Sequence, residues 1–329
     1  MGKYRIIRIH HAPFRRTPWR KLSFIKMYQT GLEYIMEKHF TPDLLHLHVA
    51  YPLGIIALLW KKRYGFQYLL TEHWTIYQPQ NAHMLKGFKK KIIVKTGQNA
   101  AGIIPVSLDL QRNMERIGII NKYHVIYNLV DTHLFRLSTP SSNEKKQMLH
   151  ISTLRDEAKN FSGILRTIEQ LRKMRNDFEL HVIHDYDASS FQAFVNQHGL
   201  NDCIFFHGKK QAEEVAQFFA KADCFILFSN FENLPCVIIE SFASGVPVIS
   251  TDVGGIAEIM SPDRGLLIQK GDEKALLEAM QQMLDNIHPY NRQAIRDYAI
   301  RTFSNENIGG QIYERYLEVK REILDVSIN

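Results

Sequence analysis

Short apolar runs alternate with stretches of helical periodicity along the whole chain. Runs of this kind are typical of parallel strands that are buried on both faces. They predict strands at residues 4–9, 44–49, 67–73, 102–107 and 124–128, and then at 148–153, 179–183, 203–207, 224–228, 246–250 and 265–268. Helices separate the strands, and one helix closes the chain. Because strand and helix alternate in both halves, we expect two doubly wound, Rossmann-like α/β domains that face one cleft.

The polar segment 137–147 (LSTPSSNEKKQ) has no periodicity and predicts a linker. We therefore expect one domain at 1–138 and a second at 139–329, with the last helix packing back on the first domain. No apolar run reaches the ~18 residues that a membrane-spanning helix needs. The three cysteines, Cys203, Cys224 and Cys236, are odd in number and have no CxxC spacing. They indicate reduced core thiols of a cytoplasmic protein.

Charge is unevenly distributed along the chain. Residues 1–100 contain 17 Lys or Arg and four acidic residues, a net charge of +13, whereas the rest of the chain carries −6 of the total of +7. The basic half predicts an anionic partner. We find no RNP-like or helix-turn-helix motif that would favour nucleic acid. An anionic membrane on the cytoplasmic side is the partner that we expect, with the protein bound peripherally.

The basic half also contains a predicted amphipathic helix near the N-terminus, which could contact the membrane. Its apolar positions recur at helical spacing: Trp19, Leu22, Ile25, Tyr28, Leu32 and Ile35. Arg20, Lys21 and Lys26 lie off that stripe, and Arg15 and Arg16 precede the helix. The run KGFKKK at 86–91 adds to the basic surface. The helix either rests on lipid or buries its stripe on the sheet, as surface helices generally do.

The stretch FENLPCVIIESFASGVPVIS at 231–250 holds two glutamates, Glu232 and Glu240. We expect a helix at 235–244, with Pro235 at its first position and Gly245 as a left-handed stop. A carboxylate accepts two hydrogen bonds side by side, so a vicinal diol suits it, and a helix N-terminus suits phosphate. The pair therefore predicts that the two carboxylates bind hydroxyl groups at both ends of a nucleotide-sugar. The alternative is two ordinary glutamates near a helix start.

The motifs around these glutamates resemble the retaining glycosyltransferases of the GT-B fold, family 4 (glycosyl transferases group 1). The Glu-x7-Glu element matches Glu232 and Glu240, followed by GVPV at 245–248 and DVGGIAE at 252–258. Upstream, YNLVD at 127–131, ISTLRDEAKN at 151–160 and TEHWT at 71–75 resemble other family motifs in the family's order. The resemblance covers residues 40–320.

The resemblance implies a role for each matched residue. Glu240 would hold the ribose hydroxyls, Glu232 would contact the transferred sugar, and Lys159 would neutralise the diphosphate. His73 would reach the donor sugar from the other domain, so that Glu232, Lys159 and His73 form the catalytic set. Donor binding would further involve the backbone amides of 233–236 and nearby side chains: Asn233, Leu234, Pro235, Cys236, Arg155, Ser229 and Gly208.

The implied reaction is transfer of a hexosyl group from a UDP- or GDP-sugar to a saccharide or lipid-linked acceptor, with retention, in the synthesis of a cell-surface polysaccharide or lipopolysaccharide. No metal or other cofactor is expected, and the DYD motif at 185–187 is interpreted as a loop. Two departures from the family stand out. Ser152-Thr153 replace the usual Gly-Arg, which leaves Arg155 as a substitute cation. The chain also opens on what resembles a later strand, so the acceptor domain is expected to lack its first βα unit. The alternatives are a non-catalytic nucleotide-sugar- or membrane-binding protein and a sugar-nucleotide epimerase.

Overall fold

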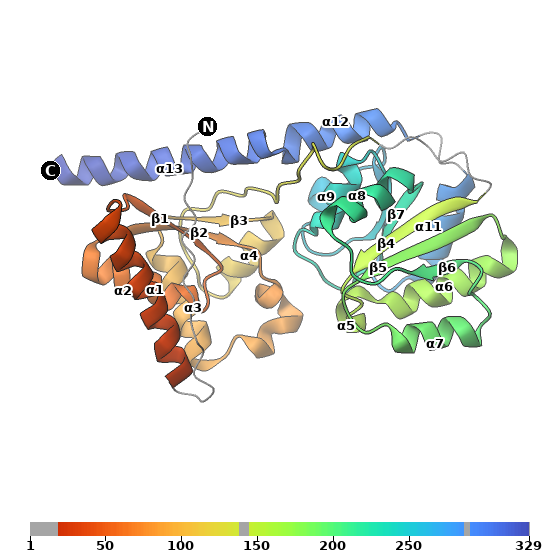
Figure 1. Cartoon of the computed structure of the whole chain (residues 1–329), viewed down its shortest axis with the longest axis horizontal. Coiled ribbons are helices and arrows are strands. Elements are labelled where there is room, and N and C mark those ends of the chain that lie inside the picture. Colours follow the sequence, from red (N-terminus) through yellow and green to blue (C-terminus); the bar gives the residue numbers. More distant parts are fainter. Residues whose placement is uncertain (1–18, 138–144, 286–289, 329) are drawn as a thin grey trace. The chain divides into compact units, whose positions relative to one another are not determined.

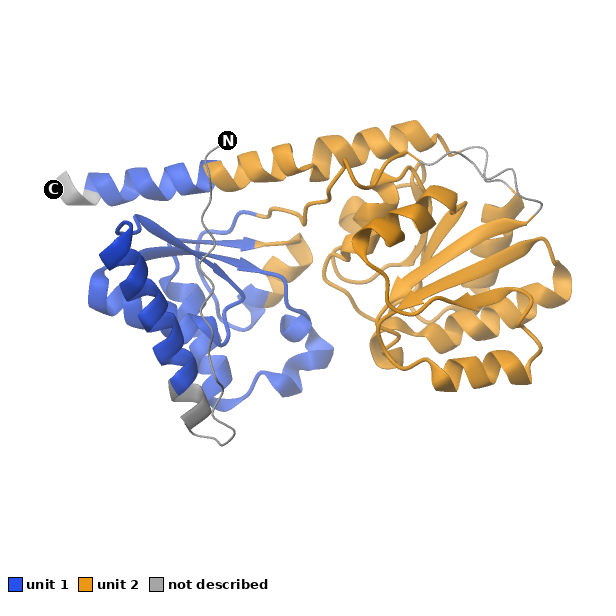
Figure 2. Cartoon of the chain, in the orientation of Figure 1, with its two compact units in different colours: residues 1–104, 114–124, 314–329 blue, residues 105–113, 125–313 orange. Residues whose placement is uncertain are grey.

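The computed structural model describes residues 19–137, 145–285 and 290–328, and it divides into two compact units (Figures 1 and 2). Unit 1 comprises residues 1–104, 114–124 and 314–329, and unit 2 comprises 105–113 and 125–313. The strand predicted at 4–9 and the basic residues Arg15 and Arg16 lie outside the described residues. Within the described ranges, no helix is long and apolar enough to cross a membrane.

Unit 1 is built on a three-stranded sheet in the order β1-β2-β3. The strands are β1 Leu44–His48, β2 Gln67–Glu72 and β3 Gly102–Pro105, and β1 pairs with β2 in parallel. The other elements are α1 Trp19–Lys38, α2 Leu53–Tyr64, η1 Thr75–Tyr77, η2 Pro79–Met84 and α3 Gly87–Asn99. In α1, Leu32 of the apolar stripe is buried, and the Gln29 amide hydrogen-bonds Tyr64 and Trp60 of α2. Helix α1 therefore packs on α2 and buries part of its stripe.

The strand predicted at 124–128 is wrong. Beside β3 the chain forms one isolated bridge, between Ile103 and Tyr123, and the hydrogen bond from His124 N to Ile103 O measures 2.9 Å. The Ile126 N–H still reaches Pro105 O at 3.2 Å. Pairing at separate points leaves no continuous ladder, so an apolar run here has extended backbone without becoming a strand.

The last helix, α13 Asn305–Ile328, contributes to both units. Its C-terminal part contacts the unit 1 sheet, where the Tyr316 hydroxyl lies 2.6 Å from His46 Nδ1 and Glu322 pairs with Lys122. Two elements likewise cross the unit boundary: β3 and α4 Leu108–Arg116.

Unit 2 is a six-stranded parallel sheet in the order β6-β5-β4-β7-β8-β9. Its strands are β4 Lys146–Ser152, β5 Phe178–His184, β6 Ile204–Phe206, β7 Cys224–Leu227, β8 Val248–Thr251 and β9 Gly265–Ile268. Its helices are α5 Asp156–Lys159, α6 Phe161–Met174, α7 Ser189–Gln197, α8 Ala212–Lys221, α9 Cys236–Ala243, α10 Ile256–Ile259, α11 Glu273–Asp285 and α12 Arg292–Phe303. Helices α6, α7 and α11 cover one face of the sheet, and α8, α9 and α12 cover the other (Figure 1). The expected doubly wound architecture is confirmed.

Strand β4 lies between β5 and β7, and there the direction of winding reverses. Doubly wound sheets bind ligands beyond the carboxyl ends of the strands at such a reversal. The loops after β4 and β7 carry the motifs at 153–160 and 229–235. The fold thus brings together two motifs that lie far apart in the sequence.

Candidate active site

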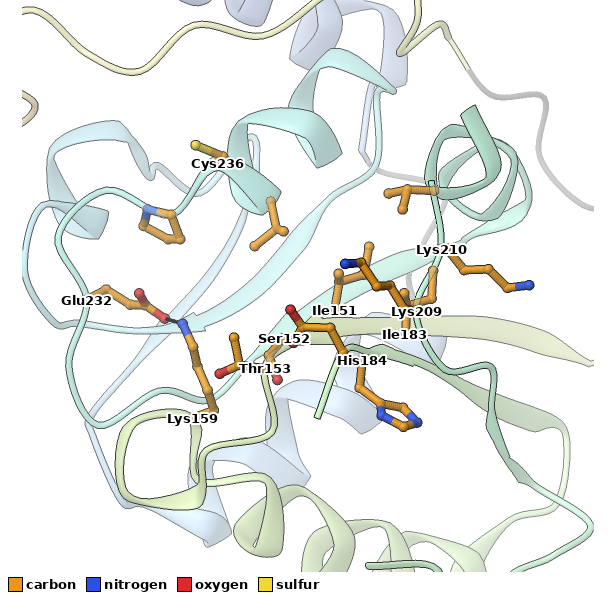
Figure 3. Close-up of a pocket in the computed structure, with 14 residues that line it drawn as sticks. Ile151, Ser152, Thr153, Lys159, Ile183, His184, Lys209, Lys210, Glu232 and Cys236 are labelled. Carbon is orange, nitrogen blue, oxygen red and sulfur yellow. Dashed lines mark hydrogen bonds and ion pairs between the residues drawn. The ribbon is translucent and has the colours of Figure 1, made fainter. Parts of the chain in front are cut away.

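A cavity of about 360 Å³ opens at the carboxyl ends of β4 and β5 and at the start of α9 (Figure 3). Besides apolar side chains, its wall contains polar and charged groups from four loops: Ser152, Thr153, Lys159, His184, Asp185, Lys209, Lys210, Glu232 and Cys236. All of these residues belong to unit 2. This is where the strand order reverses, and a helix N-terminus faces it, so the cavity suits an anionic ligand.

Glu232 and Lys159 form an ion pair at one side of the cavity (Figure 3). Glu232 is buried, and its Oε1 also accepts a hydrogen bond of 2.7 Å from the Ser229 hydroxyl. A buried carboxylate needs such donors, because burial without partners costs several kcal/mol. Without ligand, the positive charge of Lys159 is thus balanced by Glu232.

Glu240 lies one helical turn beyond Cys236 on α9, so both side chains project from the same side of that helix. Burial raises the pKa of Glu240 to about 7. In the part of the chain that the structure describes, no hydrogen bond or ion pair reaches its carboxylate. Glu240 is not part of the cavity wall, but Cys236 is. Its acceptor capacity is therefore open to hydroxyl groups of a ligand that extends along α9.

A buried histidine supports the loop after β4. His150 Nδ1 lies 2.9 Å from Ile226 O, and its Nε2 lies 2.8 Å from the Ser152 hydroxyl. A carbonyl oxygen only accepts, so Nδ1 carries the hydrogen and Nε2 accepts from Ser152. The Ser152 oxygen in turn accepts from Leu154 N–H at 3.0 Å. Burial lowers the pKa of His150 to about 4, which keeps the ring neutral and this chain of hydrogen bonds intact.

The expected row of backbone donors at 233–236 is interrupted at Pro235. Pro235 has no N–H, and it is the N-cap of α9 rather than its first residue. Asn233 and Leu234 are buried, and their carbonyls accept hydrogen bonds from Gly255 N at 2.7 Å and Asn128 Nδ2 at 2.8 Å. Of the four residues, Pro235 and Cys236 line the cavity. Gly245 adopts the predicted left-handed conformation, with φ of 71°.

Arg155 is not part of the cavity wall. Its guanidinium lies over the ring of Tyr186, 5.6 Å from the centroid. The left-handed turn at Gly208, φ of 63°, is followed by Lys209 and Lys210, which both line the cavity wall, but the Lys210 ammonium pairs with Glu214 at 3.0 Å. We had not predicted these two lysines, although a glycine and a lysine pair directly after a strand would have indicated them. The DYD segment is a loop, as predicted.

His73 belongs to unit 1, directly after β2, where its Nε2 lies 3.4 Å from His48 Nδ1. Next to it, Glu72 is fully buried and accepts hydrogen bonds from the amides of Ala50, His73 and Trp74 and from the Tyr77 hydroxyl. Glu72 therefore fixes the chain ends of both strands. Cys203 and Cys224 are buried as expected, but Cys236 is exposed, because it opens α9 at the cavity.

The sequence matches two glycosyltransferase families: "Glycosyl transferases group 1" over residues 132–302 and "Glycosyltransferase Family 4" over residues 2–134. N-acetyl-alpha-D-glucosaminyl L-malate synthase of Bacillus anthracis is 25% identical over 85% of this chain and 76% of its own length. The putative teichuronic acid biosynthesis glycosyltransferase TuaC of Bacillus subtilis is 26% identical over 76% of this chain and 63% of its own.

Solved structures show the same fold. Sucrose-phosphate synthase of Thermosynechococcus elongatus superposes with a TM-score of 0.80 at 20% identity, over 95% of this chain and 82% of that one. Anabaena HepE, crystallised with UDP, gives 0.77 at 17% identity, over 92% and 84%. The chain belongs to the glycosyl transferases group 1 family. It is a GT-B glycosyltransferase of family 4.

Proposed function

We propose that this glycosyltransferase moves a hexosyl group from a nucleoside diphosphate sugar to a saccharide or lipid-linked acceptor, with retention at the anomeric carbon. The proposed product is a cell-surface polysaccharide or lipopolysaccharide. The observation that supports the donor class is the cavity of unit 2, where a lysine–glutamate pair, Lys209 and the N-terminus of α9 meet. Relatives named for teichuronic acid and amylovoran biosynthesis support the product class.

In the proposed step, the bond between the anomeric carbon and the β-phosphate oxygen breaks while the acceptor oxygen bonds to the same face of the sugar. The acceptor proton passes to the departing phosphate oxygen. Lys159 exchanges its contact with Glu232 for the growing negative charge, and the α9 N-terminus adds its dipole. Glu232, released from Lys159, then faces the transferred sugar, and Glu240 accepts from the ribose hydroxyls.

These fixed positive groups replace a divalent cation in our proposal. Activity should therefore survive EDTA, and full loss on chelation with recovery on adding Mn²⁺ would contradict this part of it.

Incubation with radiolabelled UDP- and GDP-hexoses tests the function. Transfer to a cell-envelope extract, or slow hydrolysis of the donor, is the expected result. Tight binding without turnover would indicate a non-catalytic binding protein, and an isomerised sugar would indicate an epimerase. Either outcome overturns the proposal.

We also propose peripheral attachment to an anionic membrane. The surface that supports it lies in unit 1 at the start of α3, where Phe88 and Met84 are exposed among Lys86, Lys90 and Lys91.

A further inference from the structure

We infer that Lys209 is the second cation that binds the diphosphate of the donor. This inference rests on the proposed function. A nucleoside diphosphate carries two or more negative charges, and its departure requires positive groups placed in advance. The family's usual arginine is absent from the loop after β4, where Ser152 and Thr153 stand. The question is which residue of this chain supplies the missing charge.

Arg155 is the nearest candidate in the sequence, but its position argues against it. Its guanidinium lies over the Tyr186 ring and outside the cavity wall. Lys159 does line the cavity, yet its charge is balanced by Glu232. The two loops that match the family's motifs therefore present one cation to the cavity, and that cation is already paired.

Lys209 comes from a different loop, between β6 and α8. Gly208, with φ of 63°, turns the backbone into a left-handed conformation just before it, which is why the side chain can enter the cavity. Figure 3 shows its ammonium group directed toward the middle of the cavity, over Ile151 and Ser152. No carboxylate among the described residues lies within ion-pair distance of Lys209. Its charge is therefore available to a ligand.

Lys210 differs from Lys209 both in the direction of its side chain and in having a carboxylate partner. Its stem reaches the cavity wall, but its ammonium pairs with Glu214 at 3.0 Å, one turn into α8. In Figure 3 its side chain runs away from Lys209. Two consecutive lysines thus have the same charge and nearly the same place in the chain, but only Lys209 points into the cavity. Lys210 is the matched control.

The experiment compares binding of UDP, GDP and uridine to the full chain and to Lys209→Ala, Lys209→Arg and Lys210→Ala, by titration calorimetry. Lys209→Ala should bind the preferred nucleoside diphosphate roughly 10- to 100-fold more weakly, the size of effect expected for a charge-assisted hydrogen bond to phosphate. Lys209→Arg should recover most of the affinity, and Lys210→Ala should stay within about twofold of the parent. Thermal unfolding of each variant checks that the fold is retained.

Uridine has the base and the ribose of UDP but no phosphate, so it shows which part of the nucleotide Lys209 contacts. If Lys209 binds phosphate, its removal leaves uridine binding unchanged. An equal loss for uridine and UDP would assign Lys209 to the nucleoside and overturn the inference, as would equal affinities of Lys209→Ala and Lys210→Ala for UDP. If the parent chain binds neither UDP nor GDP, the proposed function itself fails, and that result is distinct from a failure of Lys209.

Discussion

Glu240 combines burial with a carboxylate that has no hydrogen bond or ion pair to a described residue, and its pKa of about 7 follows from that burial. Hydroxyl donors favour the charged form, so a bound ribose should lower this pKa and release a proton. Nucleotide affinity should then rise about tenfold between pH 6 and pH 8, because the free site must first lose its proton. Calorimetry in buffers of different ionisation enthalpy measures the released proton.

Glu240→Gln should weaken nucleotide binding more than it slows turnover, since a ribose contact is present in ground and transition states alike. The variant should also lose the pH dependence between pH 6 and pH 8. Unchanged affinity, or an unchanged pH profile, would remove Glu240 from the binding site.

Lys159 should behave in the opposite way. Its charge is most useful as the diphosphate departs, so Lys159→Ala should lower kcat by about 100-fold or more. It also removes the cation that pairs with the buried Glu232, so the free energy of unfolding should fall by about 1–3 kcal/mol. The double variant Lys159→Met with Glu232→Gln should recover the stability without the activity. Steady-state kinetics and denaturant unfolding separate the two effects, and a kcat within twofold of the parent would contradict the assignment.

At the scale of elements, strand β4 carries a titratable group in its centre. His150 has a pKa of about 4 in the folded chain, lower than the ordinary value of 6.5. Between pH 4 and pH 6.5 the unfolded chain therefore binds more protons than the folded chain does. The stability from this neutral histidine is complete above pH 6.5 and is lost as the pH falls toward 4. At pH 5.5 the loss should be about 1.4 kcal/mol.

His150→Asn keeps one donor and one acceptor and removes the titration, so the loss of stability between pH 6.5 and pH 4 should become shallower. It should not vanish, because burial also holds the pKa of His207 in the same unit at about 4. Urea unfolding of unit 2 at several pH values measures the slope. If the free energy of unfolding of the variant falls with pH as steeply as that of the parent, the His150 ring is not held neutral in the folded protein over this pH range.

The same elements show what a sequence can predict. Buried strands are local apolar runs, so β4, β5 and β9 were predicted to within two residues. The error at 124–128 arose because an apolar extended segment has the sequence pattern of a strand whether or not a neighbouring strand forms continuous hydrogen bonds with it. The left-handed turn at Gly245 was predictable from residue type, because glycine tolerates positive φ.

Side-chain direction was not predictable. Arg155 and Lys209 are both cations near strand ends, and the sequence favoured the one that follows the family's motif. Their places depend on Tyr186, which takes the guanidinium, and on the turn at Gly208, which aims the lysine. The contact of Arg155 with Tyr186 joins segments about 30 residues apart, and no local pattern encodes it. The turn at Gly208 is local, but the sequence does not say which side chains it brings the lysine near.

At the scale of the whole molecule, the basic surface of unit 1 predicts salt-sensitive binding to anionic vesicles. Replacing Lys86, Lys90 and Lys91 together by Gln should weaken that binding by about 3 kcal/mol, at ~1 kcal/mol for each charge near the surface. Because these side chains are exposed, stability should hardly change. Sedimentation with vesicles of graded anionic lipid content, at low and high salt, is the measurement.

A matched triple variant in unit 2, Lys221, Lys270 and Lys274 to Gln, carries the same charge change on the other unit and should bind as the parent does. Phe88→Ala tests the apolar contribution, since this side chain is 66% exposed in unit 1. Equal pelleting with neutral and anionic vesicles, or none with either, would exclude electrostatic membrane binding. The charge would then be left for an acidic acceptor or a protein partner.

The exposed position of Cys236 has a practical consequence. The other two thiols, Cys203 and Cys224, are buried, so a maleimide dye should attach to the native protein at one place without any engineered cysteine. That place is the wall of the unit 2 cavity. Neighbouring atoms partly shield the exposed Cys236 sulfur from water, and this desolvation together with the nearby Glu240 raises the pKa of the thiol, so labelling should be slow at neutral pH and faster in mild base. A bound donor would shield the sulfur, and the rate of labelling would then report occupancy in a screen for substrates or inhibitors.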